Sequence, residues 1–277
     1  MTGAPPFAYY GGKTSIAERI VDALPEHRHY IEPFAGSLAV LLAKPRAQFE
    51  TVNDLDEDLV TFWRVLRDRG DELATVCALT PHARAEHAAS FDLDVADLER
   101  ARRVWVRLSQ GRGGMLRRTG WRFYRDAARR TGSMPWTLNA YVERMWDAVE
   151  RLAGVSLECR PALQLIEDYG QHQSVLLYVD PPYLGTTRAW GNQYRHELRG
   201  DDEHRQLADL LRSCTASVVL SGYPSPLYDE LYAGWSRIEI AAFTGQGGNT
   251  GRHGGRTEVL WSNRPIGHPH LFSEVTA

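Results

Sequence analysis

The sequence predicts an α/β protein built on a doubly wound sheet, with a mostly helical insertion in its middle. Two observations predict this class. Strand-like and helix-like segments alternate up to about residue 69, and the same alternation resumes after about residue 151. Between these points the pattern is helical around a Gly-rich basic loop. The length of 277 residues, 43% of them hydrophobic and 24% charged, fits one large domain with a sizeable insertion.

The first segment is predicted to contain three helices and two strands. Its first helix is capped by Thr14 or Ser15, and the strand "HYIE" then leads through a Gly-containing turn into "SLAVLLAK", a helix that Ser37 caps. The strand "FETVN" precedes the amphipathic helix "DEDLVTFWRVLRD". Apolar residues recur on one face of this helix, which predicts that the following are buried: Leu59, Phe62, Trp63 and Leu66.

Strands and helices alternate again after the insertion. The helix "LNAYVERMWDAVERLAG" leads back to the sheet, and "DDEHRQLADLLRS" and "SPLYDELYAG" are two further helices. The last two strands are joined by the polar, Gly-rich "QGGNTGRHGG", which suits an antiparallel hairpin. Seven strands are expected in all, centred near residues 30, 50, 157, 177, 219, 240 and 259.

A local excess of arginine distinguishes the insertion from the rest of the chain. The net charge is −3, yet residues 100–130 contain eleven arginines and a single acid, Asp126. Such a segment is a candidate phosphate-binding surface, and the alternative is a solvated helix face. The loop-like "GRGG" and the aromatic "TGWRFYR" inside the segment leave both interpretations open.

Several classes of protein are not expected. No run of about 18 apolar residues offers a transmembrane helix, and the N-terminus lacks the regions of a signal peptide. Three widely spaced cysteines, Cys77, Cys159 and Cys214, show no metal-ligand spacing, which predicts a reduced, cytoplasmic protein without a metal. No long apolar surface helix stands out, which favours a monomer.

Two stretches at predicted strand ends suit a nucleoside-containing ligand. In "YIEPFAGS", Gly36 would let the backbone approach a ligand closely. About twenty residues on, Asp54 ends the next strand in "VNDLDED", where a carboxylate can accept hydrogen bonds from both ribose hydroxyls. Taken singly, the first stretch suits a plain strand-to-helix turn and Asp54 suits a helix N-cap. The spacing of the two favours a nucleoside site.

The N-terminal stretch "FAYYGGKTS" places Lys13 in front of a helix. It is too short for a Walker A loop, which needs four residues between its glycines. The chain has only one other lysine, Lys44, and a compact ammonium is not equivalent to a guanidinium. This predicts a specific contact for Lys13; an exposed lysine at a helix start is the alternative.

The stretch "VLLYVDPPYLGTT" ends an apolar strand with an acid, two prolines and a tyrosine. Asp180 can accept a hydrogen bond from an amine, and the carbonyl of Pro181, a residue without an N–H, can accept a second. Tyr183 offers a ring on which a base can stack. Two acceptors beside an aromatic platform suit a flat base with an exocyclic amine, whereas a structural turn explains only the prolines.

Together, the four stretches resemble the Dam-type DNA adenine-N6 methyltransferases. "YYGGK", "EPFAG", "VNDLDEDL" and "DPPY" occur in the order of that family, with a variable recognition region between the cofactor motif and the catalytic motif. The resemblance covers nearly the whole chain and is weakest at about 70–105 and in the tail. It implies a Rossmann-like, seven-stranded methyltransferase sheet from residues 1–69 and 152–277, with 70–151 as an inserted helical target-recognition domain.

The resemblance also implies S-adenosylmethionine as cofactor and a role for individual residues. The implied catalytic residues are Asp180, Pro181, Pro182 and Tyr183. The implied cofactor-binding residues are Tyr9, Lys13, Glu32, Phe34, Ala35, Gly36, Asp54, Leu55 and Asp180. The implied DNA-binding residues are Arg112, Arg117, Arg118, Arg122 and Arg125. One departure is that family members often have a second glycine near Gly36, where this chain has Ser37 and then a leucine.

The implied reaction is methyl transfer to N6 of an adenine flipped out of double-stranded DNA. Asp180 and the Pro181 carbonyl would bond the two N6 protons, Tyr183 would stack on the base, and the methyl group would transfer directly. Three alternatives stay open: a cytosine-N4 methyltransferase, an RNA or glutamine methyltransferase, and a catalytically silent DNA-binding relative. The target sequence and any partner nuclease are not predicted.

Overall fold

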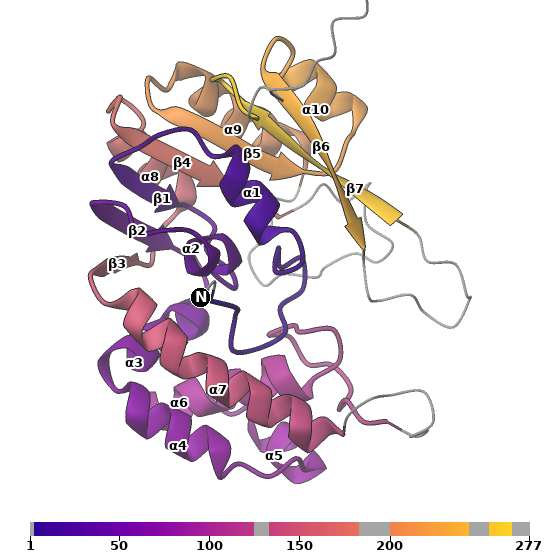
Figure 1. The fold of residues 1–277 in the computed structure, drawn as a ribbon. Coiled ribbons are helices and arrows are strands. Elements are labelled where there is room, and N and C mark those ends of the chain that lie inside the picture. Colours follow the sequence, from indigo (N-terminus) through magenta and orange to yellow (C-terminus); the bar gives the residue numbers. More distant parts are fainter. Residues whose placement is uncertain (1–2, 125–132, 183–199, 244–254, 268–277) are drawn as a thin grey trace, which may run out of the picture.

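The computed structural model describes residues 3–124, 133–182, 200–243 and 255–267. Figure 1 shows a sheet with flanking helices in the upper part of the molecule and a group of helices, α3–α7, in the lower part. In chain order the elements are α1 (Ala17–Ala23), β1 (His29–Glu32), α2 (Ala39–Ala43), β2 (Phe49–Asn53), α3 (Glu57–Asp68), α4 (Gly70–Ala78), α5 (Arg84–Ala89), α6 (Asp97–Gln110), α7 (Met134–Leu152), β3 (Val155–Glu158), α8 (Ala162–Tyr169), β4 (Val175–Val179), α9 (Asp201–Ser213), β5 (Ser217–Gly222), α10 (Pro226–Leu231), β6 (Ser236–Phe243) and β7 (Gly255–Ser262).

The sheet has the strand order β3-β2-β1-β4-β5-β7-β6, and β7 alone runs antiparallel to its neighbours. All seven predicted strands, the final hairpin pairing and the α/β class are confirmed. The strand β1 pairs with β2 on one side and β4 on the other, with Ile31 opposite both Thr51 and Leu177. The chain therefore reverses its direction of travel across the sheet between β1 and β4, and such a switch point is where open α/β sheets bind ligands.

Two predicted helix caps are wrong. The helix α1 begins at Ala17 because Thr14 and Ser15 lie in a tight turn, closed by a hydrogen bond from Ile16 N to Lys13 O at 2.9 Å. Ser37 likewise does not cap α2, which follows a turn closed from Leu38 N to Ala35 O at 2.8 Å. In both places the residues predicted to cap the helix lie instead in a backbone turn directly before it.

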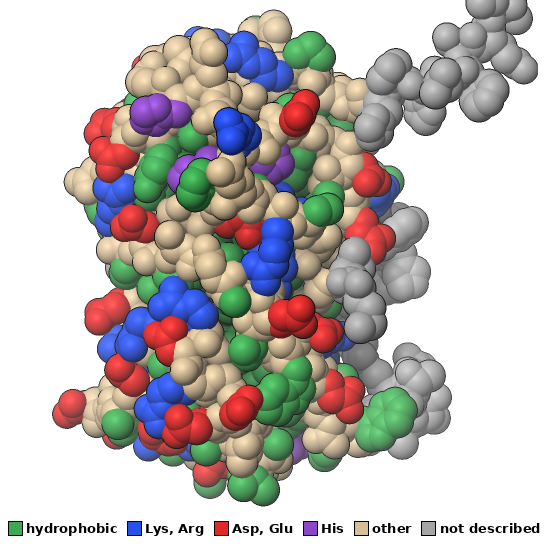
Figure 2. Space-filling view, turned by 60° about the vertical axis from the view of Figure 1, so that its left-hand side comes forward, with side chains coloured by type: hydrophobic (Ala, Val, Ile, Leu, Met, Phe, Trp, Pro, Cys, Tyr) green, Lys and Arg blue, Asp and Glu red, His purple; other side chains and the backbone are tan. Residues whose placement is uncertain are grey.

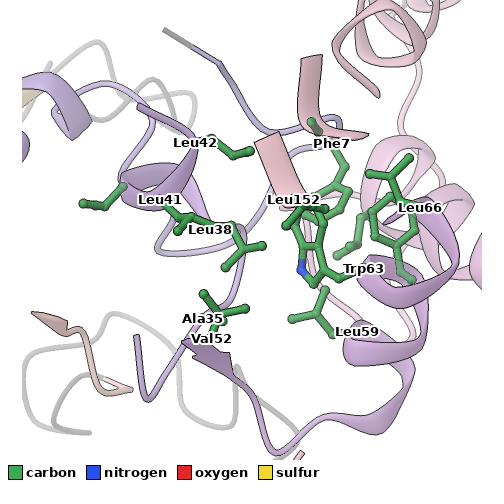
Figure 3. Close-up of a cluster of buried hydrophobic side chains, with 14 of the residues drawn as sticks. Phe7, Ala35, Leu38, Leu41, Leu42, Val52, Leu59, Trp63, Leu66 and Leu152 are labelled. Carbon is green, nitrogen blue, oxygen red and sulfur yellow. The ribbon is translucent and has the colours of Figure 1, made fainter. Parts of the chain in front are cut away.

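The helix α3 is the support on which the first strand ends rest. Its predicted inner face is confirmed, since each of the four side chains is at most 1% exposed: Leu59, Phe62, Trp63 and Leu66. Figure 3 shows Trp63 beside Leu59 and Leu66, with Ala35 and Leu38 nearby. The indole nitrogen of Trp63 donates to the carbonyl of Gly36 at 3.1 Å, which ties the loop after β1 to this helix.

The lower helices share their core with the sheet. The helix α3 packs against α4, α6 and α7, and one continuous cluster of buried residues includes Tyr30 of β1 and Trp105 of α6. Phe7 lies against the rings of Phe62 and Trp63, with ring centroids 5.1 and 5.3 Å apart. The division into 1–69 with 152–277 and an inserted 70–151 stays a prediction.

Leu38→Gly is expected to lower the free energy of unfolding by about 2 kcal/mol, because loss of packing outweighs relief of strain. Leu38 has a φ of 55° and is fully buried. A side chain in this left-handed region costs about 1–3 kcal/mol, whereas deleting a buried leucine costs about 2–5 kcal/mol. Urea denaturation measures the change, with Leu79→Ala, 79% exposed, as the control. A stabilised Leu38→Gly protein would show that strain dominates.

Candidate active site

A cavity of about 270 Å³ lies where β1, β2 and β4 end. The segment before α1 and the residues after β3 complete its walls. Every residue predicted to bind the cofactor lines it, as does Pro182, while Pro181 is buried and Tyr183 lies outside the described residues. The sequence thus predicted a set of residues, far apart in the chain, that the fold brings to one place: Tyr9, Lys13, Glu32, Phe34, Ala35, Gly36, Asp54, Leu55 and Asp180.

The loop between β1 and α2 follows the cavity wall closely. Gly36 has a φ of 49°, and a Cβ added to it would lie 3.0 Å from Cε1 of the Tyr9 ring. Only glycine suits both the left-handed backbone and this close approach. The second glycine that family members often have near Gly36 is absent here. Two residues after Gly36, Leu38 also has a positive φ, a backbone conformation that glycine adopts without strain. The loop keeps its turn although the second glycine is absent.

Asp54 holds this loop against the end of β2. Its Oδ2 accepts a hydrogen bond from Gly36 N and its Oδ1 one from Asp56 N, both at 2.9 Å. The alternative of Asp54 as helix N-cap is wrong, because Asp56 accepts from the backbone N–H groups of Asp58 and Leu59 and caps α3 itself. Asp54 is therefore a carboxylate at the cavity wall, oriented by two backbone donors.

Lys13 makes a specific contact with the acid that follows β4. Its Nζ lies 2.7 Å from Asp180 Oδ1, with the two side chains 5% and 20% exposed. The same ammonium lies 3.5 Å from Oε1 of Glu258. A buried lysine is strongly disfavoured without a charged partner, so this contact explains why the residue is neither exposed nor free at the helix start.

The charge states of the cluster follow from burial and from these contacts. Burial raises the pKa of Asp180 to about 6; Lys13 lowers it and Glu258 raises it. Burial alone would lower the pKa of Lys13, but the carboxylates of Asp180 and Glu258 raise it above its ordinary value. Burial also raises the pKa of Glu32 to about 7, although Tyr30 donates to it at 2.6 Å. At neutral pH, Asp180 is mostly ionised and bonded to a charged lysine.

Further cavity residues were not predicted. Asn53 links three strand ends, because its amide group bonds Pro33 O at 2.9 Å and both the N–H and the carbonyl of Arg160 at 3.0 Å. The start of α8, a helix not predicted from the sequence, follows β3 and brings Pro161, Ala162 and Leu163 to the wall. The sequence could have indicated these three residues, because they follow a predicted strand in the same way as the cavity residues that follow β1 and β2. The remaining wall residues outside the predicted set are Tyr10, Gly11, Gly12, Pro33, Ser37, Ala39, Val40, Asp56, Leu116 and Tyr178.

The arginine-rich segment divides into two parts. The four arginines of α6 have partners within the protein. Arg100 pairs with Asp58 at 2.5 Å, and Arg102 and Arg103 both pair with Glu99 at 2.7 Å. Arg107 is 3% exposed and donates a hydrogen bond to the carbonyl of Ser90. These four do not form a phosphate-binding surface, which corrects that part of the expectation. Figure 2 shows the same mixing of basic and acidic side chains over the lower helices.

The arginines from Arg112 to Arg122 lie on a loop that folds back on itself. Arg112 N donates to Gly120 O at 2.9 Å and Arg122 N to Gln110 O at 2.7 Å. Arg112, Arg117 and Arg118 are exposed, Arg122 is half-buried, and Arg125 lies outside the described residues. Within the described ranges no salt bridge joins an acid to any of the first four. The guanidinium of Arg118 lies 4.4 Å from the centroid of the Phe91 ring, and Arg122 donates to the hydroxyl of Tyr124 at 2.9 Å.

This loop also contacts the cavity. Gly114 O accepts a hydrogen bond from Tyr10 N at 2.8 Å, and Leu116 lines the cavity. In the same loop the ring of Trp121 stacks on His82 with centroids 4.3 Å apart, and the guanidinium of Arg84 lies 4.6 Å from the Trp121 ring. One loop therefore carries exposed arginines and stacked rings and also contributes Leu116 to the cavity wall.

No helix in the described ranges is both long and apolar enough to cross a membrane. No group of three or more His, Cys, Asp or Glu side chains in the described part of the chain is arranged to hold a metal ion.

The chain matches known proteins over most of its length. A model of the D12 class of N6 adenine-specific DNA methyltransferases matches residues 9–246. The "Type II methyltransferase M1.LlaDCHI" of Lactococcus lactis subsp. cremoris is 25% identical over 295 residues, covering 93% of this chain and 95% of that protein. The "DNA N-6-adenine-methyltransferase" of Escherichia phage P1 is 26% identical over 244 residues, covering 82% of this chain and 30% of that protein.

Proposed function

The chain belongs to the D12 class of N6 adenine-specific DNA methyltransferases, and from that premise we propose that it methylates a flipped adenine at a specific site in duplex DNA. DNA is its substrate and S-adenosylmethionine its cofactor. The observation that carries the finer proposal is the ion pair of Asp180 and Lys13 at the wall of a cavity, at the switch point of the sheet. An ionised acceptor in a partly dry pocket is what an exocyclic amine requires.

The donors and acceptors of the cavity fit this cofactor. Asp54 follows β2 and Asp180 follows β4, so the end of β1 lies between the two carboxylates. Asp54, oriented by two backbone N–H groups, suits a ribose diol, and Leu55 and Leu163 offer apolar contacts for a base. Asp180 and Glu32 place acidic groups where a positive sulfonium would be stabilised. When bound, the cofactor supplies an electrophilic methyl group on that sulfonium.

The residues of this chain then activate the amine. The N6 lone pair of adenine is delocalised into the ring and is a weak nucleophile. Asp180 and the Pro181 carbonyl accept hydrogen bonds from the two N6 protons, which favours a more tetrahedral nitrogen with an available lone pair. Lys13 holds Oδ1 of Asp180, so the carboxylate is oriented before the base arrives. Tyr183, proposed to stack on the base, lies outside the described residues.

Methyl transfer is expected to slow by roughly tenfold between pH 7.5 and pH 5, because Asp180 must be ionised to accept a hydrogen bond. Its pKa is about 6, so the active, ionised form is present above that pH and is lost as pH falls through it. Single-turnover rates at saturating cofactor and DNA measure the profile. Circular dichroism at pH 5 checks that the fold persists. A rate that stays constant from pH 7.5 to 5 would exclude Asp180 as the titrating acceptor.

Arg117→Ala combined with Arg118→Ala is expected to weaken DNA binding and to lower the slope of log affinity against log salt by about 2, one for each phosphate contact. Both side chains are exposed and lie beside Leu116, which lines the cavity. Fluorescence anisotropy with a DNA duplex at several salt concentrations gives the slope. Arg64→Ala is the control, since this exposed arginine on α3 is paired with Asp97. An unchanged slope in the double variant would remove both residues from the interface.

The form of the nucleic acid that the protein prefers is tested by offering one sequence as duplex DNA, as single-stranded DNA and as RNA. Labelled methyl transfer is measured on duplex DNA, on each single strand and on the matching RNA. Duplex DNA is expected to be the preferred substrate, with base flipping costing a few kcal/mol that protein contacts offset. Preference for the single strand would contradict flipping, and preference for RNA would overturn the proposed duplex substrate. A monomeric enzyme stays a prediction.

A further inference from the structure

Lys13 joins the catalytic carboxylate to a second acid for which the proposed reaction has no role. Its ammonium lies 2.7 Å from Asp180 Oδ1 and 3.5 Å from Oε1 of Glu258. Glu258 belongs to β7, opposite Ile240 of β6, and comes 78 positions after Asp180 in the numbering of the chain. A single lysine therefore faces two carboxylates, one directly after β4 and one within β7.

The second contact is buried and fixed. The side chains of Lys13 and Glu258 are 5% and 3% exposed, and charges so far from water interact much more strongly than charges on a surface. Ser221 of β5 donates a hydrogen bond to the same Glu258 oxygen at 2.7 Å. The strand β5 lies between β4 and β7 in the sheet. Three adjacent strands thus hold Asp180, Ser221 and Glu258 in a fixed arrangement around the ammonium.

Because Lys13 also pairs with Glu258, Asp180 is a stronger hydrogen-bond acceptor than it would be as the single carboxylate beside that ammonium. A carboxylate whose negative charge is fully matched by one lysine is a weaker acceptor for another donor, because the cation withdraws charge from both oxygens. With two carboxylates around one ammonium, the cluster keeps a net negative charge. In the described part of the chain, the hydrogen bond to the Asp180 side chain comes from Lys13 at Oδ1. The other oxygen, Oδ2, is the one that the target amine would meet.

We propose that Glu258 is a positioning residue for methyl transfer, which draws the Lys13 ammonium toward β7 and thereby keeps Asp180 a strong acceptor for the target amine. The inference rests on the proposed function of Asp180. Glu258 does not touch the substrate in this account; it acts through Lys13. In this proposal the hydroxyl of Ser221 holds the Glu258 carboxylate in the orientation that faces Lys13.

In the described part of the chain, the other titratable groups that interact with Asp180 are Tyr178 on β4 and Glu32 on β1. Burial raises the pKa of Tyr178 well above its ordinary value, so it stays neutral. Burial raises the pKa of Glu32 to about 7, and the charge of Asp180 contributes to that rise. For Asp180 itself, burial raises the pKa, Lys13 lowers it and Glu258 raises it. Removing the charge of Glu258 is therefore expected to lower the pKa of Asp180.

Glu258→Gln tests the proposal, since it keeps the size of the side chain and an acceptor oxygen but removes the charge. Carbon-13 NMR of the aspartate side-chain carboxyls follows the titration of Asp180, whose signal is identified by its loss in Asp180→Asn. The midpoint, about 6 in the wild-type protein, is expected to fall because the negative charge of Glu258, which raises the pKa of Asp180, is removed. The kcat at pH 7.5 is expected to fall roughly tenfold, the usual loss for a supporting residue around a site.

Glu239→Gln is the matched control, an exposed acid on the neighbouring strand β6 that pairs with Arg237 at 2.8 Å. It should change neither quantity. A lower midpoint together with slower transfer supports the charge sharing. An unchanged or raised midpoint overturns it, and so does an unchanged kcat. A merely structural role would alter the melting temperature without moving the midpoint.

A second variant, Glu258→Asp, serves if Glu258→Gln fails to fold. Its side chain is one methylene shorter, so the carboxylate lies farther from Lys13, and a smaller fall of the Asp180 titration midpoint is expected. The NMR titration needs no catalysis. A wild-type protein that transfers no methyl group would therefore contradict the proposed function, while the midpoint would still decide whether Glu258 and Asp180 share Lys13.

Discussion

Asp180→Asn is expected to reduce methyl transfer by roughly 10³-fold or more while the protein stays folded and binds its cofactor. The asparagine has the same shape and can still accept from Lys13 through its amide oxygen. It lacks the negative charge, and its NH₂ group meets the target amine with a donor where an acceptor is required. The loss therefore falls on the chemical step rather than on assembly of the site.

The measurement is single-turnover transfer from labelled S-adenosylmethionine to duplex DNA, with cofactor affinity measured separately by calorimetry. Asp168→Asn is the control, because this 59% exposed acid on α8 pairs only at the surface with Arg160. The control should transfer at the wild-type rate. Transfer by Asp180→Asn within tenfold of the wild-type rate would mean that the carboxylate is not the essential acceptor.

Asp54→Ala is expected to weaken cofactor binding by roughly 100-fold, since hydrogen bonds to a charged group contribute about 1.5–3 kcal/mol each. Two backbone donors lose their acceptor in this variant, Gly36 N and Asp56 N. The loop after β1 then loses one of the bonds that hold its left-handed glycine against the Tyr9 ring. The proposed bonds to the ribose hydroxyls disappear at the same time.

Calorimetry with S-adenosylmethionine measures this change. Glu57→Gln removes a carboxylate three positions away that is 74% exposed, and it should leave the affinity unchanged. Affinity close to that of the wild-type protein in Asp54→Ala would place the ribose elsewhere in the cavity. Equal losses in both variants would point to the general charge of this segment rather than to the geometry of Asp54.

The sequence predicted those structural features that depend on the pattern of neighbouring residues in the chain. Apolar runs identified all seven strands, and acids and glycines at strand ends identified residues that parallel pairing brings to one edge, such as Gly36, Asp54 and Asp180. The inner face of α3 followed from helical periodicity in the same way. Each of these depends on residues close together in the chain or on the general rule for parallel strands.

The parts that the sequence did not predict depend on contacts between distant segments. Glu258 meets Lys13 only because β7 is inserted antiparallel beside β5, and Leu116 reaches the cavity only because its loop bonds Tyr10. The arginines of α6 looked like a phosphate-binding surface, since their acidic partner Asp58 comes from another helix. Local spacing carries no signal for such partners, so charge counted along the chain overestimates the exposed charge.

The most direct test of the central claim is the identity of the methylated nucleoside. Unmethylated duplex DNA is treated with the protein and labelled S-adenosylmethionine, digested to nucleosides and separated. The account predicts N6-methyladenine as the labelled product, lost in Asp180→Asn. Labelled N4-methylcytosine, or no labelled nucleoside although the cofactor binds, would contradict it.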